Sequence, residues 1–160
     1  MSTTYHVTFT DRMAAALTRA LLRAGVKLGT MSLLTVRGRT SGQPHTVLVL
    51  PVEQDGERWL VAPYGAVQWV RNIRAAGTAT LTRGRRSEAI SVRELEAKEA
   101  APVLKQYLLL PVSAGVLSYF DATKDSPLEA FEREAARHPV FQITTVEGPT
   151  RQERSMKETE

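Results

Sequence analysis

The stretch from Arg37 to His45 concentrates groups that can bind an anion. It reads Arg-Gly-Arg-Thr-Ser-Gly-Gln-Pro-His, with two arginines, two hydroxyls and a histidine beside flexible glycines. Glycine lets the backbone approach a ligand closely, and the N–H groups of a turn can form an anion-binding nest. Arginine adds a rigid fork of donors that suits phosphate. No Gly-Lys-Ser/Thr opens a helix here, so this is not a nucleotide P-loop. Taken alone, the stretch also fits an ordinary hairpin turn.

A second stretch joins Ala62-Pro63-Tyr64-Gly65 to Gln68-Trp69-Val70-Arg71-Asn72. Along this stretch a strand is expected to end, a glycine-containing turn to follow and a helix to begin. The first turn of a helix presents unpaired N–H groups to an anion or to a polarised ring edge. Trp69 is a common kind of core anchor in this setting, whereas Arg71 and Arg74 point off the Trp69 face and can reach a negative ligand.

The elements that must position these stretches are mostly strands at hairpin spacing. Strands are expected at Met31–Arg37, His45–Val52, Arg58–Ala62, Thr78–Arg83, Ser87–Arg93 and Val140–Val146. Helices are expected at Val67–Ala76, Ala97–Leu109 and Ser126–Ala136. About six antiparallel strands with three or four helices predict a mainly β, α+β fold, a small barrel with helices outside.

Length and composition predict one domain with one core, since the chain has 160 residues. We expect an amphipathic helix in residues 1–29, the barrel in residues 30–146 and a charged, disordered tail in residues 147–160. Without an apolar run of about 18 residues or a secretory signal, the cytoplasm is the expected location. The basic helix leaves peripheral contact with a membrane as an alternative.

Several kinds of chemistry are excluded by residue content. The chain has no cysteine, which excludes disulfides and thiol nucleophiles. Its three histidines lack metal-ligand spacing and form no Ser-His-Asp arrangement, so no metal is expected. Residues 30–93 hold nine basic against four acidic side chains, which favours an anionic ligand. Nucleic acid is not expected, because only 6% of residues are aromatic and none lies in the basic hairpin Arg83–Arg86.

The two stretches together resemble the deazaflavin-dependent nitroreductase family, also described as flavin/deazaflavin oxidoreductases. The resemblance lies in the order and spacing of several short pieces across about residues 30 to 145. The matching pieces are Leu34–Pro44, Leu60–Gly65, Trp69–Asn72, Tyr119–Asp121, Asp125–Phe131 and His138–Phe141.

The resemblance implies a split, FMN-binding-like β-barrel that binds coenzyme F420, a deazaflavin with a phosphorylated, glutamate-bearing tail. By this resemblance Arg39, Thr40 and Ser41 hold the phosphate, and His45 adds a basic contact. Better-known members carry lysine or arginine at positions 40 and 45, so weaker phosphate binding is expected here unless Arg37, Arg71 or Arg85 compensates. The residues implied to wall the cofactor are Leu48, Ala62, Pro63, Tyr64, Gln68, Trp69 and Asn72.

The implied activity is hydride transfer from reduced F420 to a quinone, a nitroaromatic or an activated alkene, because the cofactor carries the redox chemistry. Tyr64, Tyr107 and Tyr119 are the candidates for substrate contact and proton donation, and each also fits a half-buried packing role. The loop from Tyr64 to Trp69 is shorter than in nitroimidazole-activating members, which argues against their prodrug activity. A homodimer is the implied assembly.

Two other interpretations of the same barrel remain open at this point. The first is an FMN-binding flavoprotein similar to the pyridoxamine oxidases. The second is a non-catalytic carrier that sequesters a flavin, a lipid or a haem-like ligand.

Overall fold

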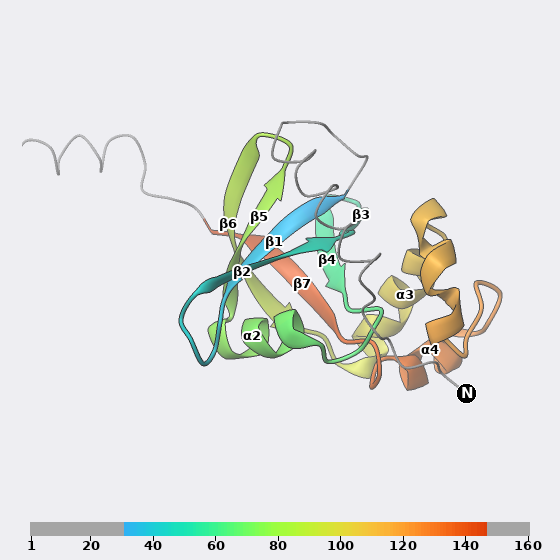
Figure 1. Cartoon of the computed structure of the whole chain (residues 1–160). Coiled ribbons are helices and arrows are strands. Elements are labelled where there is room, and N and C mark those ends of the chain that lie inside the picture. Colours follow the sequence, from blue (N-terminus) through green and yellow to red (C-terminus); the bar gives the residue numbers. More distant parts are fainter. Residues whose placement is uncertain (1–30, 147–160) are drawn as a thin grey trace, which may run out of the picture.

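A computed structural model describes residues 31–146, apart from the side chains of residues 111–114. The expected N-terminal helix and C-terminal tail lie outside the described residues. Within residues 31–146, seven strands form one antiparallel sheet in the order β2-β1-β5-β6-β7-β4-β3 (Figure 1). The strands are β1 (Ser32–Arg37), β2 (Pro44–Val49), β3 (Val52–Gln54), β4 (Glu57–Val61), β5 (Thr78–Arg83), β6 (Arg86–Glu94) and β7 (Val140–Thr145).

Chain connectivity forces this sheet to curl. The two edge strands, β2 and β3, are consecutive in the sequence, and only Leu50 and Pro51 separate them. Seven flat strands would hold the two edges about 29 Å apart, at about 4.8 Å per strand. The three residue steps from Val49 to Val52 span about 11 Å at most. The sheet therefore bends until its edges approach each other, which confirms the expected split β-barrel.

The count of seven strands differs from the expected six at one place. The apolar run His45–Val52 predicted a single strand, but the structure ends β2 at Val49 and begins β3 at Val52. Pro51 is the physical reason, because proline has no N–H to donate to a strand ladder. Beyond Pro51 the chain pairs with β4 instead of β1, and Val52 lies opposite Trp59.

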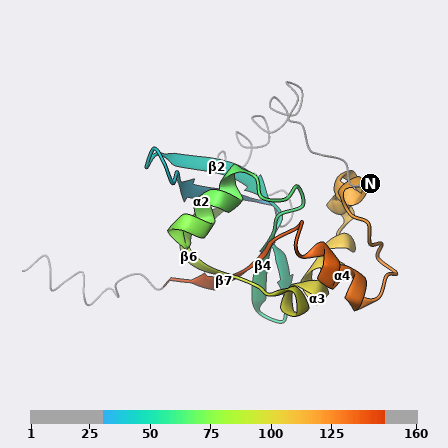
Figure 2. The ribbon, with the colours of Figure 1, turned by 90° about the horizontal axis from the view of Figure 1, so that it is seen from below.

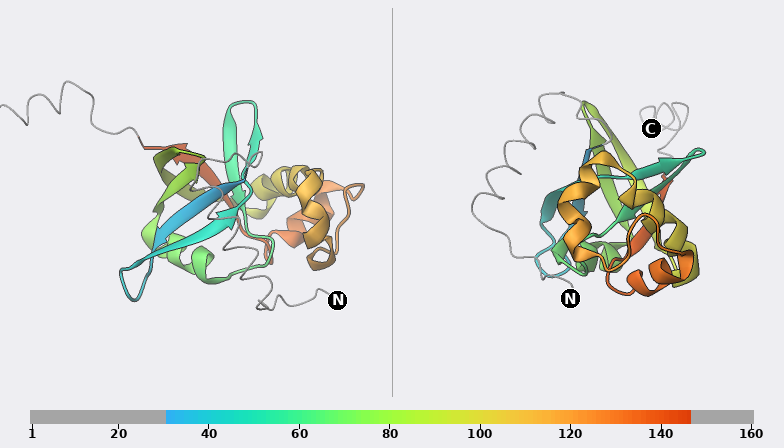
Figure 3. Two further views of the ribbon diagram at one scale, coloured as in Figure 1. Left: turned by 45° about the horizontal axis from the view of Figure 1, so that its top comes forward. Right: turned by 90° about the vertical axis from the view of Figure 1, so that its right-hand side faces the viewer.

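The green helix of residues 68–76 lies apart from the yellow and orange helices of residues 97–134 (Figures 2 and 3). Among the described residues, two apolar clusters hold the barrel and these helices together. The first lies inside the barrel, where α2 (Gln68–Ala76) buries Val70 and Ile73 against Leu34 and Phe141. The second lies outside β4 and β7, under α3 (Ala97–Leu108), a 3₁₀ helix η1 (Pro111–Tyr119) and α4 (Leu128–Glu134). Successive side chains of β4 point to opposite faces of the sheet, so Leu60 packs in the first cluster and Val61 in the second.

The end of α2 is set by Gly77, as the sequence predicts. Gly77 has a φ of 72°, in the left-handed region, and its N–H donates to the carbonyl of Ile73 at 2.7 Å. Within residues 31–146, none of the helices is both long enough and apolar enough to span a membrane.

Candidate functional site

Arg39 joins the β1–β2 turn to α2. Its Nη1 donates to the side-chain oxygens of Gln68 and Asn72, each at 2.8 Å. Its backbone N–H donates to the same oxygen of Asn72 at 3.2 Å. Asn72 is buried and Gln68 lies one helical turn before it, so both amides face the turn. The two stretches singled out in the sequence therefore meet in space.

The charge of Arg39 is oriented without being neutralised. Gln68 and Asn72 are neutral amides, and no carboxylate of a described residue pairs with Arg39. Five other described arginines each pair with a carboxylate, namely Arg58, Arg74, Arg83, Arg93 and Arg137. A guanidinium has five donors, so the remaining N–H groups of Arg39 can bind a ligand. This arrangement suits a phosphate.

The β1–β2 turn brings the side chains of Ser41 and His45 close to Gly38, next to Arg39. The groups of Arg39, Ser41 and His45 around Gly38 are called the cradle below. Gly38 N donates to the carbonyl of Gln43 at 2.7 Å, which closes the turn. A Cβ on Gly38 would lie 2.8 Å from Ser41 Oγ and 2.9 Å from His45 Nε2, so both side chains approach the bare backbone there. Ser41 Oγ accepts from Gln43 N at 3.2 Å, which leaves its own O–H to donate elsewhere. The hydroxyl, imidazole and guanidinium together fit the F420 phosphate that the resemblance implies.

Trp69 is the second residue of α2 and packs against the apolar cluster inside the barrel. It is half-buried against the barrel cluster, and its ring centroid lies 6.0 Å from that of Phe141. The helix that carries it begins at Gln68 without a side-chain cap. Trp69 therefore serves as a core anchor, and contact of its exposed edge with a ring stays a prediction.

The three candidate tyrosines lie close together just after the C-terminal end of β4. The rings of Tyr64 and Tyr119 meet edge to face, with centroids 5.1 Å apart and planes at 82°. Tyr64 is 37% exposed, whereas Tyr107 is buried beside Phe120. Burial, with a smaller contribution from Tyr64, raises the pKa of Tyr107. Tyr107 thus stays protonated and packed, and Tyr64 is the more exposed of the two.

The tyrosine group and the Arg39 cradle lie along one loop. Four residue steps separate Tyr64 from Gln68, so their Cα atoms lie within about 14 Å of each other. Ala62 is fully buried at the start of the loop, and its N–H donates to the carbonyl of Pro139 at 2.9 Å. Pro63 follows, half-buried. The tyrosine group and the Arg39 turn are therefore joined by a short stretch of chain whose first residues are buried or half-buried.

Four other predicted cofactor residues lie outside the group formed by Arg39, Ser41 and His45. Leu48 lies opposite Leu33, and strand alternation turns it away from Val47 and Val49, which pack on the barrel cluster. Arg37 shares that outer side by the same alternation, being one residue past the buried Val36. Thr40 and Arg71 are exposed beside the turn and on α2. Cofactor contact by these four stays a prediction.

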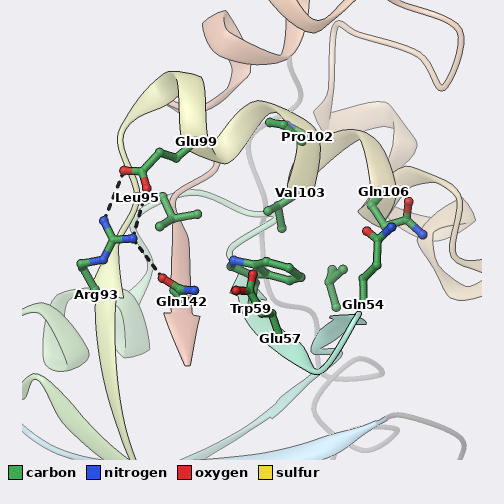
Figure 4. A pocket seen from close by; sticks show the side chains of 11 residues that line it. Gln54, Glu57, Trp59, Arg93, Leu95, Glu99, Pro102, Val103, Gln106 and Gln142 are labelled. Carbon is green, nitrogen blue, oxygen red and sulfur yellow. Dashed lines mark hydrogen bonds and ion pairs between the residues drawn. The ribbon is translucent and has the colours of Figure 1, made fainter. Parts of the chain in front are cut away.

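A cavity of about 270 Å³ lies elsewhere, between the β3–β4 hairpin and α3 (Figure 4). Trp59 and Val103 form its apolar base, and Arg93 at its edge is bonded to Glu99 and Gln142. None of the residues predicted for the site lines it. Among the described residues, no cluster of three or more histidine and carboxylate side chains could hold a metal ion.

Sequence reasoning missed a buried polar pair behind the tyrosines. Glu134 and His138 are 2% and 3% exposed, and Glu134 Oε2 lies 3.2 Å from His138 Nε2. In the sequence, His138 stands out only within the matching piece His138–Phe141, after a helix expected to end at Ala136; α4 ends at Glu134. The signal that could have revealed the pair is the spacing of four residues, which brings two side chains together on one helical turn.

His138 predicts a pH dependence of stability. Burial lowers the pKa of His138 more than the Glu134 carboxylate and nearby backbone groups raise it. The unfolded chain therefore binds more protons than the folded protein near and below the ordinary pKa of about 6.5. The free energy of unfolding should fall between pH 7 and pH 5, and His138→Phe should reduce that slope. Urea unfolding at several pH values measures this, and an unchanged slope in the variant would refute it.

Comparison with known proteins gives the family. The family model for F420H2-dependent quinone reductase matches residues 9–121 of this chain. A comparison with functionally curated proteins finds no significant match.

Solved structures share the fold. An "F420-H2 Dependent Reductase (FDR-A)" superposes with a TM-score of 0.51 at 24% identity, covering 72% of this chain and 94% of that one. A chain described as a "domain-swapped dimer" gives a TM-score of 0.55 at 23% identity, covering 86% and 100%. An FMN-binding protein of Nostoc punctiforme related to pyridoxamine 5'-phosphate oxidase gives 0.51 at 12% identity, covering 82% and 78%.

The family match spans more than two thirds of the chain and includes the Arg39 turn, α2 and the tyrosine group. The FMN-binding relative shares the architecture, so the barrel alone does not distinguish the two cofactors. The family model does distinguish them, and it confirms the cofactor implied by the sequence. This chain belongs to the F420H2-dependent quinone reductase family, whose reductant is coenzyme F420.

Proposed function

We propose that this reductase passes hydride from reduced F420 to a quinone at the exit of β4, with the cofactor phosphate on Arg39. The observation that carries the proposal is the pair of neutral amides holding the Arg39 guanidinium. A carboxylate partner, which five other described arginines have, would balance the charge of Arg39 within the fold. Amides fix its direction and leave its charge for an anion.

At the phosphate end, three side chains have separate roles. Arg39 supplies paired donors and most of the attraction. Ser41 donates its hydroxyl, whose oxygen is already oriented by Gln43 N. His45 reaches the same face of Gly38 as Ser41, from β2.

At the acceptor end, Tyr64 and Tyr119 form the wall. When bound, the reduced deazaflavin supplies the hydride. Quinone reduction also requires a proton, and in this proposal the partly exposed Tyr64 supplies it from Oη. Tyr119 fixes the Tyr64 ring by edge-to-face contact. Nitroaromatics and activated alkenes present a similar flat, electron-poor face, and we propose them as secondary acceptors.

An assay with reduced F420 and menadione tests this function. We expect deazaflavin absorbance to return on mixing, and we expect Tyr64→Phe to lower kcat about tenfold or more, as loss of a general acid does. The dissociation constant for F420 should stay within about twofold, because the phosphate cradle is untouched. Binding of FMN with no response to F420, or binding of reduced F420 that no quinone oxidises, would refute the proposal.

The cradle over Gly38 makes its own prediction. A methyl group in Gly38→Ala would meet Ser41 Oγ and His45 Nε2, both of them ends of movable side chains. The fold should tolerate the change while the cradle opens. We expect about fivefold weaker F420 binding, equivalent to about 1 kcal/mol, with little change in melting temperature. Titration followed by deazaflavin fluorescence measures this, and Gly115→Ala, where a Cβ meets open space, is the matched control.

A homodimer is the assembly that we propose for this chain. The support is one solved structure of the same fold, which is described as a domain-swapped dimer. Light scattering on a sizing column checks the assembly, and a monomer at working concentration would refute it.

A further inference from the structure

Glu134 fixes the segment that follows Tyr119. Its Oε1 accepts the backbone N–H groups of Asp121 at 2.6 Å and Ala122 at 2.7 Å. Glu134 is 2% exposed, so these bonds are shielded from water. A charged acceptor makes stronger hydrogen bonds than a neutral one. One carboxylate oxygen thus ties the end of the η1 region to α4.

The other oxygen of Glu134 draws in two more groups. Glu134 Oε2 lies 3.0 Å from Arg137 Nη2 and 3.2 Å from His138 Nε2. Arg137 Nη2 also donates to Asp121 Oδ2 at 2.6 Å. Arg137 therefore reinforces the link between α4 and the segment after Tyr119 from the solvent side.

Residues 137–139, which follow α4, contact the loop that carries Tyr64. Ala62 N donates to the carbonyl of Pro139 at 2.9 Å. A Cβ on Gly65 would lie 3.2 Å from the carbonyl oxygen of Arg137, and Gly65 has a φ of 84°. The loop from Ala62 to Gly65 thus rests directly on residues 137–139.

His138 lies where the two braced segments meet. Its ring is 3% exposed and stacks on Phe120, with centroids 3.9 Å apart and planes at 15°. Its edge faces backbone groups of Pro63 and Tyr119. Its Nε2 also lies 3.2 Å from Glu134 Oε2, so one buried ring contacts α4 and both braced segments. Burying a polar ring costs free energy unless it contacts polar groups, and here those groups belong to the two segments that carry the tyrosines.

We propose that the cluster Glu134, Arg137 and His138 is a positioning unit that holds Tyr64 and Tyr119 in their edge-to-face geometry for the acceptor. None of the three is a catalytic residue, since each acts through the two tyrosines. The proposal rests on the proposed function, in which those tyrosines form the acceptor wall. Catalytic geometry must be held within about 0.5 Å, which loops achieve only when they are braced.

Two variants test whether the cluster positions the tyrosines or only fills the protein interior. Glu134→Gln retains an oxygen for the two backbone N–H groups but removes the charge that attracts Arg137. His138→Phe retains the stack on Phe120 and removes both nitrogens. Glu99→Gln is the matched control, because Glu99 also pairs with an arginine and lies beside the cavity of Figure 4.

The measurements are kcat/KM for menadione, the dissociation constant for F420, and amide hydrogen exchange over residues 62–65 and 119–122. We expect kcat/KM to fall about tenfold in both variants, because small misplacements of reacting groups are costly. F420 affinity should stay within about twofold, and both segments should exchange faster. Glu99→Gln should match the wild type.

Two outcomes would overturn the positioning role. In the first, the variants exchange faster in both segments yet turn over menadione like the wild type. In the second, F420 affinity falls as much as kcat/KM does, which would show a general loss of structure. A wild-type protein that does not reduce menadione would instead refute the proposed function, so the two failures are distinguishable.

Discussion

Replacing Arg39 by alanine should weaken F420 binding about a hundredfold. Two charge-assisted hydrogen bonds to a phosphate would be lost, at about 1.5 kcal/mol each, and about 3 kcal/mol corresponds to a factor of about a hundred. Arg39 is exposed, and the turn beneath it is closed by backbone hydrogen bonds such as Gly38 N to Gln43 O. The fold should therefore survive the change. Fluorescence titration of F420 measures the loss directly.

Arg93→Ala is the matched control for that experiment. Arg93 is also exposed and also bonded to a glutamine side chain, but it pairs with Glu99 beside the cavity instead of facing α2. Its removal should leave F420 affinity unchanged. Equal affinities for wild type and Arg39→Ala would place the phosphate elsewhere.

The second large effect is expected from Asn72→Asp, a change of one atom in the side chain. Asn72 Oδ1 accepts from both the backbone and the guanidinium of Arg39, and an aspartate can accept both bonds equally well. The new charge would neutralise Arg39 and repel the phosphate. We expect F420 binding to weaken about thirtyfold, or about 2 kcal/mol, while the protein stays folded.

Gln142→Glu gives the corresponding control. Gln142 Oε1 accepts from Arg93 Nη2 at 2.9 Å, so the same amide-to-carboxylate exchange occurs beside an arginine outside the site. F420 affinity should not respond to it. If Asn72→Asp binds F420 as tightly as the wild type, the free charge of Arg39 is not what attracts the cofactor.

Much of the fold could be predicted because hairpin signals are local. The strand Thr78–Arg83 was predicted with the bounds that the structure shows, since Gly77 and Gly84 bracket it. The division of His45–Val52 into two strands was missed. A proline inside an apolar run can lie at a strand edge or break the strand, and only pairing with β4 settles the matter.

The turn that carries Arg39 was more predictable than the tyrosine group. Arg39, Ser41 and His45 fall within one turn, so their proximity follows from a few residues of sequence. The meeting of Tyr64 with Tyr119 depends on packing between residues far apart in the chain. The Glu134 cluster depends on it too, because its partners at Asp121 and Ala122 lie across a bend that no periodic pattern marks.

A structure of the protein with F420 bound tests the central claim most directly. The phosphate should lie within hydrogen-bond distance of the Arg39 guanidinium and the Ser41 hydroxyl, with the deazaflavin ring toward Tyr64. A phosphate remote from Arg39, or a ring seated in the cavity beside Trp59, would contradict the account.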